Sequence, residues 1–558
     1  MSSTALTDTH AHDDPNLIGA RKAASVIVLR DSPQGPEVLM LRRAERDGDI
    51  RSGVWVFPGG VLDPVDRQLH ARCVGDEDAQ ASARLALPQG GLDYSVAAVR
   101  ECFEEVGLLF ANGQMEAALR EQASAVTGAD FVALCERHHL QLDMTALQYH
   151  SHWLTPPGLP KRFDTRFYVA RLPEGQVPQA DEGEALEIAW LTPHAALDPA
   201  AKRKLLPVTR RTLQDVARFS HVQACLMDAA ARVHPPRMMP RMGRDARGAR
   251  PVLPDEWAYA EIGRLDPEGR GDVYFDLQPQ RVVQLSERVR RVTCNNGSVM
   301  TGPGTNTYLV GAPGSDTISV IDPGPSDADT DAHLQAVMEA VGAARITRIL
   351  VTHTHKDHSP AALRLRELTG AVLVGRRAAH SEWQDAHFAP KLEPADDERY
   401  VLGEGCTLRA VATPGHASNH LCWLLEEEKL LFTGDHVMQG STVVINPPDG
   451  HMGSYLASLK RLLYLELDWF APGHGFLMAR PHDEVRKLIA HRLAREAKVL
   501  AALRAGALAV ADDLLPTVYG DVPQARHGIA MRSLTAHLQK LAEDGLAAVD
   551  ASGTWQAL

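Results

Sequence analysis

The stretch that decides the fold is Val351–His358, which reads Val-Thr-His-Thr-His-Lys-Asp-His. The preceding segment, Ile346–Leu350, is rich in apolar residues and predicts a short buried strand. Ser359 and Pro360 follow, and both favour the start of a helix. We therefore expect three imidazoles and one carboxylate on a tight strand-to-helix loop at the edge of a sheet.

The side chains of this loop are metal ligands by type. Zn²⁺ binds histidine nitrogen and aspartate oxygen, and three protein ligands leave a fourth position open for water. Four donors within one loop are too many for a single open site, so two metal ions are expected. Further donors follow in similar settings at the ends of expected strands: His416, Asp435 and His474.

These donors resemble the ligand set of the metallo-β-lactamase fold, an αββα sandwich, which we expect over residues 281–484. The resemblance implies that one zinc ion is held by His353, His355 and His416. It implies that the second is held by Asp357, His358 and His474, that Asp435 bridges the two, and that Asp357 is catalytic. Asp322, which follows another expected strand, is expected to be a structural turn carboxylate.

A second group of motifs lies within residues 21–220. Trp55–Gly60 reads Trp-Val-Phe-Pro-Gly-Gly, and Arg100–Leu108 reads Arg-Glu-Cys-Phe-Glu-Glu-Val-Gly-Leu. On a helix, Glu101, Glu104 and Glu105 share one face. Adjacent carboxylates repel one another unless a cation offsets them, and oxygen ligands suit Mg²⁺ or Mn²⁺. The alternative is a solvated acidic face paired with arginine.

The two motifs resemble the Nudix box, which implies an α/β/α sandwich and a small-molecule diphosphate substrate. By that resemblance Glu104 and Glu105 carry metal, and Glu101 binds metal or acts as the base. Arg100, also assigned a catalytic role, orients the carboxylates, and the turn Gly59–Gly60 contacts substrate.

An insertion of about residues 66–93 stretches the box, and the glutamate usually found there has no identifiable counterpart. The stretched form, together with Arg162–Phe167 and Trp190, resembles the coenzyme A diphosphatase branch of the family.

The remaining segments frame these domains. Residues 1–20 are polar and are expected to be a disordered tail. Residues 221–280 are expected to be a Pro/Arg-rich linker, whose arginines either dock on acidic surfaces or contact phosphate. Residues 485–558 predict three helices and a short hairpin, which resemble a small winged-helix module. Its third helix is only mildly basic, so packing or dimerisation is favoured over nucleic-acid binding.

The bulk composition limits the functional classes. The 558 residues are 44% hydrophobic and 23% charged, which is typical of a globular protein with several domains. The net charge of −13 argues against non-specific adhesion to nucleic acid or anionic membrane. Seven scattered cysteines predict reduced thiols and a cytoplasmic location. Long apolar runs are absent, so no membrane partner is expected.

The fold class predicted is thus a multidomain α/β and α+β chain, and the function predicted is that of a two-site metal-dependent hydrolase. The leading hypothesis for the zinc site is cleavage of single-stranded RNA, as in endoribonuclease-like members of the fold. The alternative is a glyoxalase II-like or acyl-coenzyme A thioesterase. The Nudix site is expected to hydrolyse a compound such as coenzyme A. A non-catalytic binding scaffold is the third hypothesis, and a homodimer is compatible with all of them.

Overall fold

The computed structural model describes residues 14–44, 52–114, 118, 128–179, 185–506 and 510–558. The chain divides into two compact units. Unit 1 takes in residues up to Met242 together with 251–254 and 268–271, and unit 2 takes in the rest. Most of the tail predicted over residues 1–20 lies outside the described residues. Its described end forms the 3-10 turn Pro15–Leu17, and the first strand begins at Ala20.

Unit 1 is built on one eight-stranded mixed sheet. Its main path runs in the order β10-β2-β1-β9-β8-β11, while β3 pairs with β2 and β4 pairs with β1. The strands are β1 (Ala20–Ser32), β2 (Gly35–Arg43), β3 (Trp55–Val56), β4 (Gly59–Val61), β8 (Gln148–Leu154), β9 (Arg162–Arg171), β10 (Ala185–Leu191) and β11 (Arg237–Met238). The central pair β1–β9 is parallel, and β1–β2 is antiparallel.

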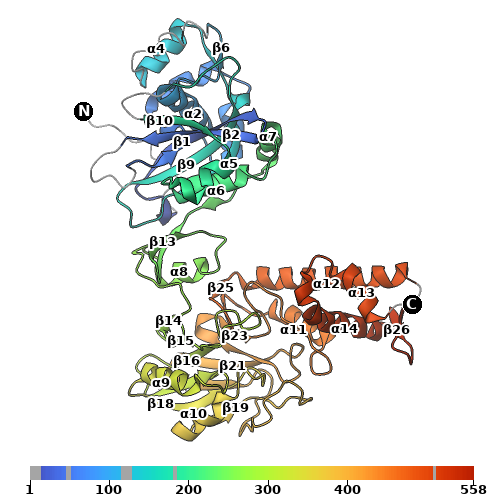
Figure 1. Ribbon diagram of the computed structural model, residues 1–558. Coiled ribbons are helices and arrows are strands. Elements are labelled where there is room, and N and C mark those ends of the chain that lie inside the picture. The colour runs from blue at the N-terminus through green and yellow to red at the C-terminus, as the bar shows by residue number, and fades with distance from the viewer. Residues whose placement is uncertain (1–13, 45–51, 115–117, 119–127, 180–184, 507–509) are drawn as a thin grey trace. The chain divides into compact units, whose positions relative to one another are not determined.

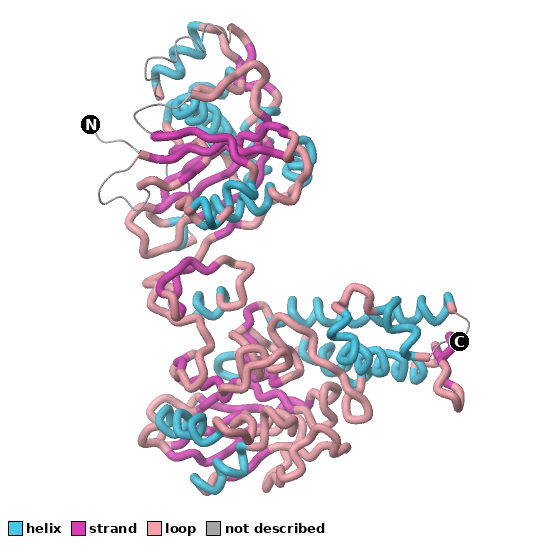
Figure 2. Tube along the Cα trace, viewed as in Figure 1, coloured by secondary structure: helices cyan, strands magenta, loops and turns pink. Residues whose placement is uncertain are grey.

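Alternation of side chains along β1 places helices on both faces of this sheet. Val26 and Val28 pack with residues of α2 (Gly91–Val106), whereas Ile27 and Leu29 pack with residues of the helices on the other face. Those helices are α5 (Pro193–Leu197), α6 (Pro207–Val216) and α7 (Val222–Ala231). Figures 1 and 2 show α2 and α6 on opposite sides of the strands. Unit 1 is therefore the predicted α/β/α sandwich.

The predicted insertion between the glycine turn and α2 is folded. It contains the 3-10 helix η2 (Pro64–Arg72), β5 (Cys73–Val74) and α1 (Asp78–Leu85). β5 joins a small sheet with β6 (Ala111–Asn112) and β7 (Gln141–Asp143), next to α4 (Ala129–Arg137). Short 3-10 turns follow at 144–146 and 199–201.

Unit 2 contains two six-stranded sheets, each with consecutive strands as neighbours. The first comprises β14 (Val282–Gln284), β15 (Val289–Thr293), β16 (Asn306–Val310), β17 (Thr317–Ile321), β18 (Arg345–Leu350) and β19 (Val372–Val374). The second comprises β20 (Arg399–Gly403), β21 (Cys406–Ala412), β22 (Leu421–Leu425), β23 (Leu430–Gly434), β24 (Trp469–Pro472) and β25 (Met478–Ala479).

Three apolar clusters stack these sheets and their helices into four layers. One lies between the sheets and includes Tyr308 and Phe432, whose ring centroids are 4.9 Å apart. A second joins the first sheet to α9 (Thr330–Val341) and α10 (Ala361–Thr369). A third joins the second sheet to α11 (Met452–Leu462). This arrangement is the predicted αββα sandwich (Figure 1).

The segment 221–280, predicted to be a linker, carries regular structure. It contains α7, β11, the hairpin β12 (Arg241–Asp245) and β13 (Gly248–Val252), and α8 (Tyr259–Leu265). Within unit 2, Glu261 of α8 is 2% exposed and accepts two hydrogen bonds from Arg291 of β15, at 2.7 and 2.8 Å. The same carboxylate accepts the Leu477 amide at 2.8 Å. A buried bidentate ion pair therefore makes α8 part of unit 2.

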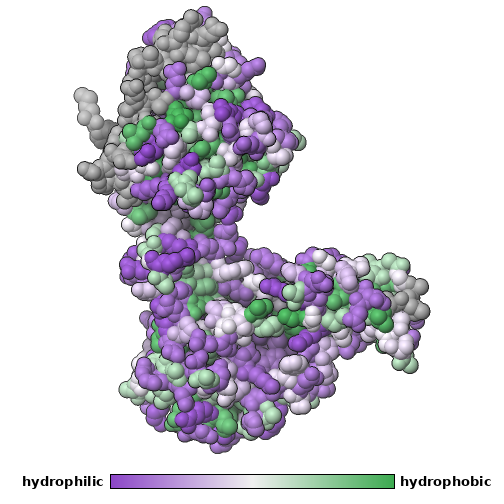
Figure 3. Space-filling model, viewed as in Figure 1, coloured by the Kyte–Doolittle hydropathy of each residue, from purple (hydrophilic) through white to green (hydrophobic). Residues whose placement is uncertain are grey.

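The end of the chain forms the predicted three helices and hairpin. They are α12 (Pro481–Ala505), α13 (Ala511–Val518), α14 (His527–Glu543), β26 (Ala547–Val549) and β27 (Trp555–Ala557). Within the described ranges, no helix has the length and apolar character that crossing a membrane requires. All seven cysteines lie in these ranges as free thiols. The face drawn in Figure 3 is largely hydrophilic, with smaller apolar clusters.

Candidate metal centre

The loop between β18 and α10 carries four of the predicted donors. β18 ends at Leu350, and α10 begins at Ala361 after Pro360, whose φ of −61° already suits a helix. Asp322 anchors the loop, because its carboxylate accepts hydrogen bonds from the Thr352 amide at 2.8 Å and from the Thr352 hydroxyl at 2.7 Å. The strand and helix therefore fix both ends of the loop, and Asp322 fixes its middle.

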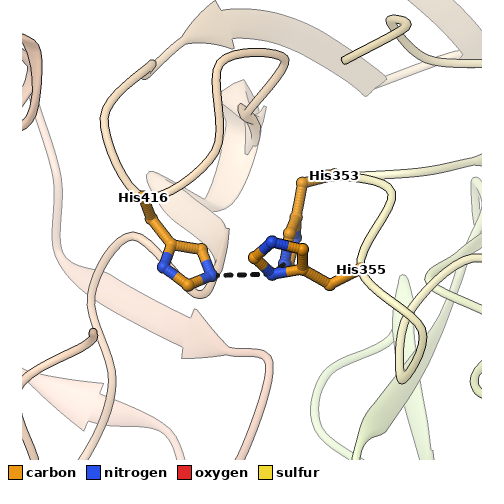
Figure 4. Close-up of side chains that lie close together, drawn as sticks. All are labelled: His353, His355 and His416. Atoms are coloured by element: carbon orange, nitrogen blue, oxygen red, sulfur yellow. Dashed lines mark hydrogen bonds between the residues drawn. The ribbon is translucent and has the colours of Figure 1, made fainter. Parts of the chain in front are cut away.

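Three histidines form the first donor group. His353 Nε2 and His355 Nδ1 are 3.0 Å apart, and His355 Nδ1 and His416 Nε2 are also 3.0 Å apart. Figure 4 shows His353 and His355 projecting from one loop toward His416 on a facing loop. Nitrogen ligands about 2.0–2.1 Å from a tetrahedral zinc ion lie a little over 3 Å from one another. The spacing therefore suits one cation.

A second donor group comprises Asp357, His358, Asp435 and His474, whose ligand atoms all lie within 4.8 Å of one another. Asp435 Oδ1 is 3.3 Å from both His358 Nε2 and His474 Nε2. Its other oxygen, Oδ2, is 3.7 Å from His416 Nε2 in the first group. One carboxylate thus faces both groups, as a bridging ligand requires.

Buried polar atoms in the second group fit a bound cation. His358 Nε2, His474 Nε2 and Asp435 Oδ1 are buried and have no hydrogen-bond partner among the described residues. Such atoms are costly to bury unless an ion or water satisfies them. A divalent cation would satisfy all three together, so the residues present fit a metal centre.

The charge states of the first group and of Asp435 suit metal binding. Burial is the main cause, and repulsion by nearby imidazoles the second, of the low pKa values of two rings. The pKa of His353 lies well below its ordinary value, and that of His355 is lowered to about 3. Both rings are therefore neutral and offer a lone pair. Burial opposes ionisation of Asp435, but the neighbouring His474 and His358 hold its pKa well below the ordinary value. The bridging carboxylate is thus charged.

Partners on the far side of each ring orient the ligand nitrogens. His358 Nδ1 lies 2.9 Å from Asp322 Oδ2, and His416 Nδ1 lies 2.7 Å from the Val444 carbonyl. His474 Nδ1 lies 3.2 Å from the Gly304 carbonyl. Each contact keeps the proton on Nδ1 and leaves Nε2 free to bind a cation. Asp322 was predicted to be a structural turn carboxylate near the metal loop; its contact with His358 was not predicted.

The turn Pro472–His474 can approach the centre only because residue 473 is glycine. A Cβ there would lie 2.7 Å from His358 Cε1 and 2.9 Å from Asp435 Oδ1. Real Cβ contacts are not that short, so any side chain would displace a ligand of the second group.

Unit 1 gathers its predicted residues around Arg100, which is 3% exposed. The Arg100 guanidinium donates to Glu101 at 2.8 Å and Glu104 at 3.2 Å through one nitrogen, and to Asp66 at 2.7 Å through Nε. Asp66 lies in the stretched part of the box and is fully buried. It places a carboxylate beside Arg100 in the segment where the sequence offered no identifiable glutamate. The 3-10 helix that carries it was not apparent from the sequence.

The other predicted residues of unit 1 adjoin this cluster. Gly59 donates its amide to Glu105 at 2.8 Å, and a Cβ on Gly60 would lie 2.3 Å from the Glu101 carboxylate. Burial raises the pKa of Glu101 to about 7 and also raises the pKa of Glu104. Within the described ranges, the three glutamates do not converge as closely as the two donor groups of unit 2.

Comparison with known proteins matches three domains in the predicted order. The family description "Metallo-beta-lactamase superfamily" matches residues 300–474. "Lactamase-like protein adaB" of Aspergillus niger is 34% identical over 286 residues, which span 47% of this chain and 83% of that protein. The chain belongs to the metallo-beta-lactamase superfamily. It is a metal-dependent hydrolase by its domains.

This superfamily domain is flanked by two others. The description "NUDT19 Nudix domain" matches residues 69–218, and "Beta-lactamase associated winged helix domain" matches residues 511–555. The "Atrochrysone carboxyl ACP thioesterase dmxR1" of Cryptosporiopsis is 31% identical and spans 54% of this chain and 95% of that protein. A solved beta-lactamase domain protein from Burkholderia ambifaria is 20% identical, with a TM-score of 0.45, and spans 50% of this chain and 95% of its own.

Two arginines of the predicted linker, for which docking on acidic surfaces and phosphate contact were the alternatives, pair with carboxylates. Arg237 pairs with Asp14 at 2.5 Å, and Arg250 pairs with Glu256 at 2.8 Å. On α14, Lys540 pairs with Glu496 at 3.0 Å and with Asp544 at 2.6 Å. Helix α14 also packs against α11 and α12. These contacts belong to unit 2, and the preference for packing over nucleic-acid binding stays a prediction.

Proposed function

We propose that unit 2 binds two Zn²⁺ ions and hydrolyses the thioester of an acyl group carried on a phosphopantetheine thiol, as in coenzyme A or an acyl carrier protein. The observation that carries this proposal is the pair of donor groups joined by Asp435. One group is His353, His355 and His416; the other is Asp357, His358 and His474. The neutral imidazoles of the first group and the charged carboxylate of Asp435 are ligands of the kind that a dinuclear zinc site needs.

Bound zinc ions would supply a water of lowered pKa and would stabilise negative charge on the carbonyl oxygen. The chain's residues do the positioning. Asp435 sets the separation of the two donor groups, and Asp322 and Val444 hold His358 and His416 in the required tautomer. Asp357, 27% exposed at its side chain, is the most exposed donor of the second group and would orient the attacking water. Water and thioester yield a carboxylate, a free thiol and one proton.

A thioester is favoured over RNA for two reasons. A relative 31% identical over 95% of its length carries the name of an acyl carrier protein thioesterase. The arginines that suggested a phosphate-contacting arm, such as Arg237 and Arg250, pair with carboxylates. Binding of RNA draws on Lys and Arg that are free to contact phosphates.

For unit 1 we propose hydrolysis of the diphosphate of coenzyme A or a related nucleotide, with Mg²⁺ or Mn²⁺ held by Glu101, Glu104 and Glu105. Burial raises the pKa of Glu101 to about 7, which suits a group that exchanges protons near neutrality. Both proposed activities would act on one molecule, acyl-coenzyme A: one frees the thiol and the other cleaves the diphosphate.

The test is an activity screen of the full chain with zinc and with manganese. The substrates are acyl-coenzyme A, acyl-pantetheine, coenzyme A and labelled single-stranded RNA. His416→Ala should abolish thiol release and leave coenzyme A cleavage, whereas Glu104→Gln should do the reverse. Each variant is thus the control for the other.

Thiol release that survives His416→Ala would overturn the thioesterase proposal. RNA cleavage that His416→Ala removes, without thiol release by the wild type, would replace the thioester by a phosphodiester. Coenzyme A left intact by the wild type at every manganese concentration would overturn the proposal for unit 1.

A further inference from the structure

One loop of unit 2 lies between a predicted metal ligand and the winged-helix module. This loop, residues 443–451, follows β23 and precedes α11. The Val444 carbonyl accepts from His416 Nδ1 at 2.7 Å. The neighbouring carbonyl, that of Val443, accepts a hydrogen bond from Arg492 of α12. Consecutive peptides therefore connect a helix of the module to the ring of His416.

The side chain of Arg492 is buried and held in place at this contact. It is 3% exposed, and its guanidinium lies 5.4 Å above the ring of Tyr455 on α11. The Tyr455 hydroxyl donates to the His436 carbonyl at 2.9 Å, one residue after Asp435. A single buried guanidinium thus supports the segments that carry two of the predicted ligands.

A second link runs from α14. His451 Nε2 lies 2.8 Å from Glu543 at the end of α14, and the His451 amide donates to the Gly415 carbonyl at 2.7 Å. Gly415 precedes His416 and packs closely, since a Cβ there would lie 2.3 Å from the Tyr455 Cα. Both the ring and the backbone of His416 are therefore held by elements that the module contacts.

We propose that the winged-helix module is a structural part of the metal centre. Arg492, through Val443 and Val444, and Glu543, through His451, act as positioning residues for His416. They set the affinity of the three-histidine group for its cation. This inference rests on the two-metal centre of the proposed function and is independent of its substrate. Loss of a partner behind a metal-binding histidine typically weakens metal affinity about 10–100-fold.

The chain offers a matched control on the same helix. Arg495 is 8% exposed, donates to the Val518 carbonyl, pairs with Asp521 at 2.7 Å and lies 4.4 Å above the ring of Tyr519. It thus makes the same kinds of contact as Arg492, but inside the module and without a connection to His416.

The experiment compares full-length Arg492→Met, Arg492→Lys and Arg495→Met with the wild type. Metal is stripped, and the protein is titrated with Zn²⁺ in competition with a chromophoric chelator. Arg492→Met should keep one equivalent at wild-type affinity and bind the other about 10–100-fold more weakly. Arg492→Lys should recover part of that loss, because its ammonium can donate to Val443. Arg495→Met should bind both equivalents normally.

Hydrogen exchange of residues 440–452 in the metal-free protein gives a second measurement. It should speed up in Arg492→Met and stay unchanged in Arg495→Met. Wild-type zinc affinity in Arg492→Met, or an equal loss in Arg495→Met, would overturn the proposal. If Arg492→Met does not fold, Glu543→Ala at the surface takes its place, and unchanged zinc binding there would overturn it equally. Failure of the wild type to hydrolyse thioesters leaves these results unaffected.

Discussion

Replacement of Asp322 by asparagine tests the orientation of the second donor group most directly. Asp322 is 2% exposed and has a φ of +49°, a conformation that asparagine also tolerates. Its Oδ1 accepts the Thr352 amide, and its Oδ2 accepts both the Thr352 hydroxyl and His358 Nδ1. The change therefore keeps shape and backbone but replaces one acceptor by a donor.

Either orientation of the new amide loses a contact. If its NH₂ group faces the Thr352 amide, two donors meet, and a buried donor without a partner costs about 1–3 kcal/mol. If it faces His358 Nδ1, that ring must carry its proton on Nε2, the atom that lies 3.3 Å from Asp435. A ring in that tautomer cannot bind a cation. We therefore expect a loss in zinc affinity of about 10–100-fold at the second group.

The assay is zinc titration with a competing chelator, together with thermal unfolding. Asp164→Asn in unit 1 is the control, because Asp164 is also buried and accepts Arg166 at 2.7 Å without contacting a ligand histidine. It should lower the unfolding temperature and retain both zinc equivalents. Wild-type zinc affinity in Asp322→Asn, or an equal loss in Asp164→Asn, would refute the reasoning.

Three further predictions follow from contacts in the two units. Gly473→Ala should remove bound zinc and lower activity more than about tenfold, because its Cβ would lie 2.7 Å from His358; metal analysis by mass spectrometry measures this. Mn²⁺ affinity of unit 1 should rise with pH through about 7, because Glu101 has its pKa raised by burial to about 7 and must lose a proton; calorimetry on Glu101→Gln should show no such rise. Burial lowers the pKa of His150 to about 3 from 6.5, so the folded state binds fewer protons. The free energy of unfolding of unit 1 should therefore fall by up to about 1.4 kcal/mol per pH unit as pH falls from 6.5 towards about 3. His150→Gln should flatten this slope in denaturant unfolding.

The predictable parts of the fold are those that depend on the pattern of residues within a short stretch of sequence. The loop after β18 combines an apolar strand, closely spaced donors and a helix start within a short stretch, so its structure could be read directly. The three terminal helices followed from similarly local signals, whereas the two sandwiches were predicted through the resemblance of their motifs to known families. Convergence of His416, Asp435 and His474 on that loop was predictable only through the resemblance to a known fold.

Residues whose role depends on distant partners were not predictable. Asp66 lies in an insertion with no recognisable spacing, and its partner Arg100 comes 34 positions later. Arg492 stands in a helix with many charged neighbours, where arginine usually faces water. The short α8 looked like part of a polar connection because the burial of Glu261 depends on Arg291. Tertiary pairing, absent from any local window, decides each case.

The pairing of Glu261 with Arg291 has a consequence for modularity. A fragment that starts at residue 281 would contain every predicted zinc ligand, yet it would leave Arg291, 1% exposed at its side chain, as a buried cation without its carboxylate. Removal of one member of such a pair costs about 3–5 kcal/mol, a large share of the stability of an ordinary domain. The point at which the two units can be cut apart, or joined by gene fusion, therefore lies upstream of α8.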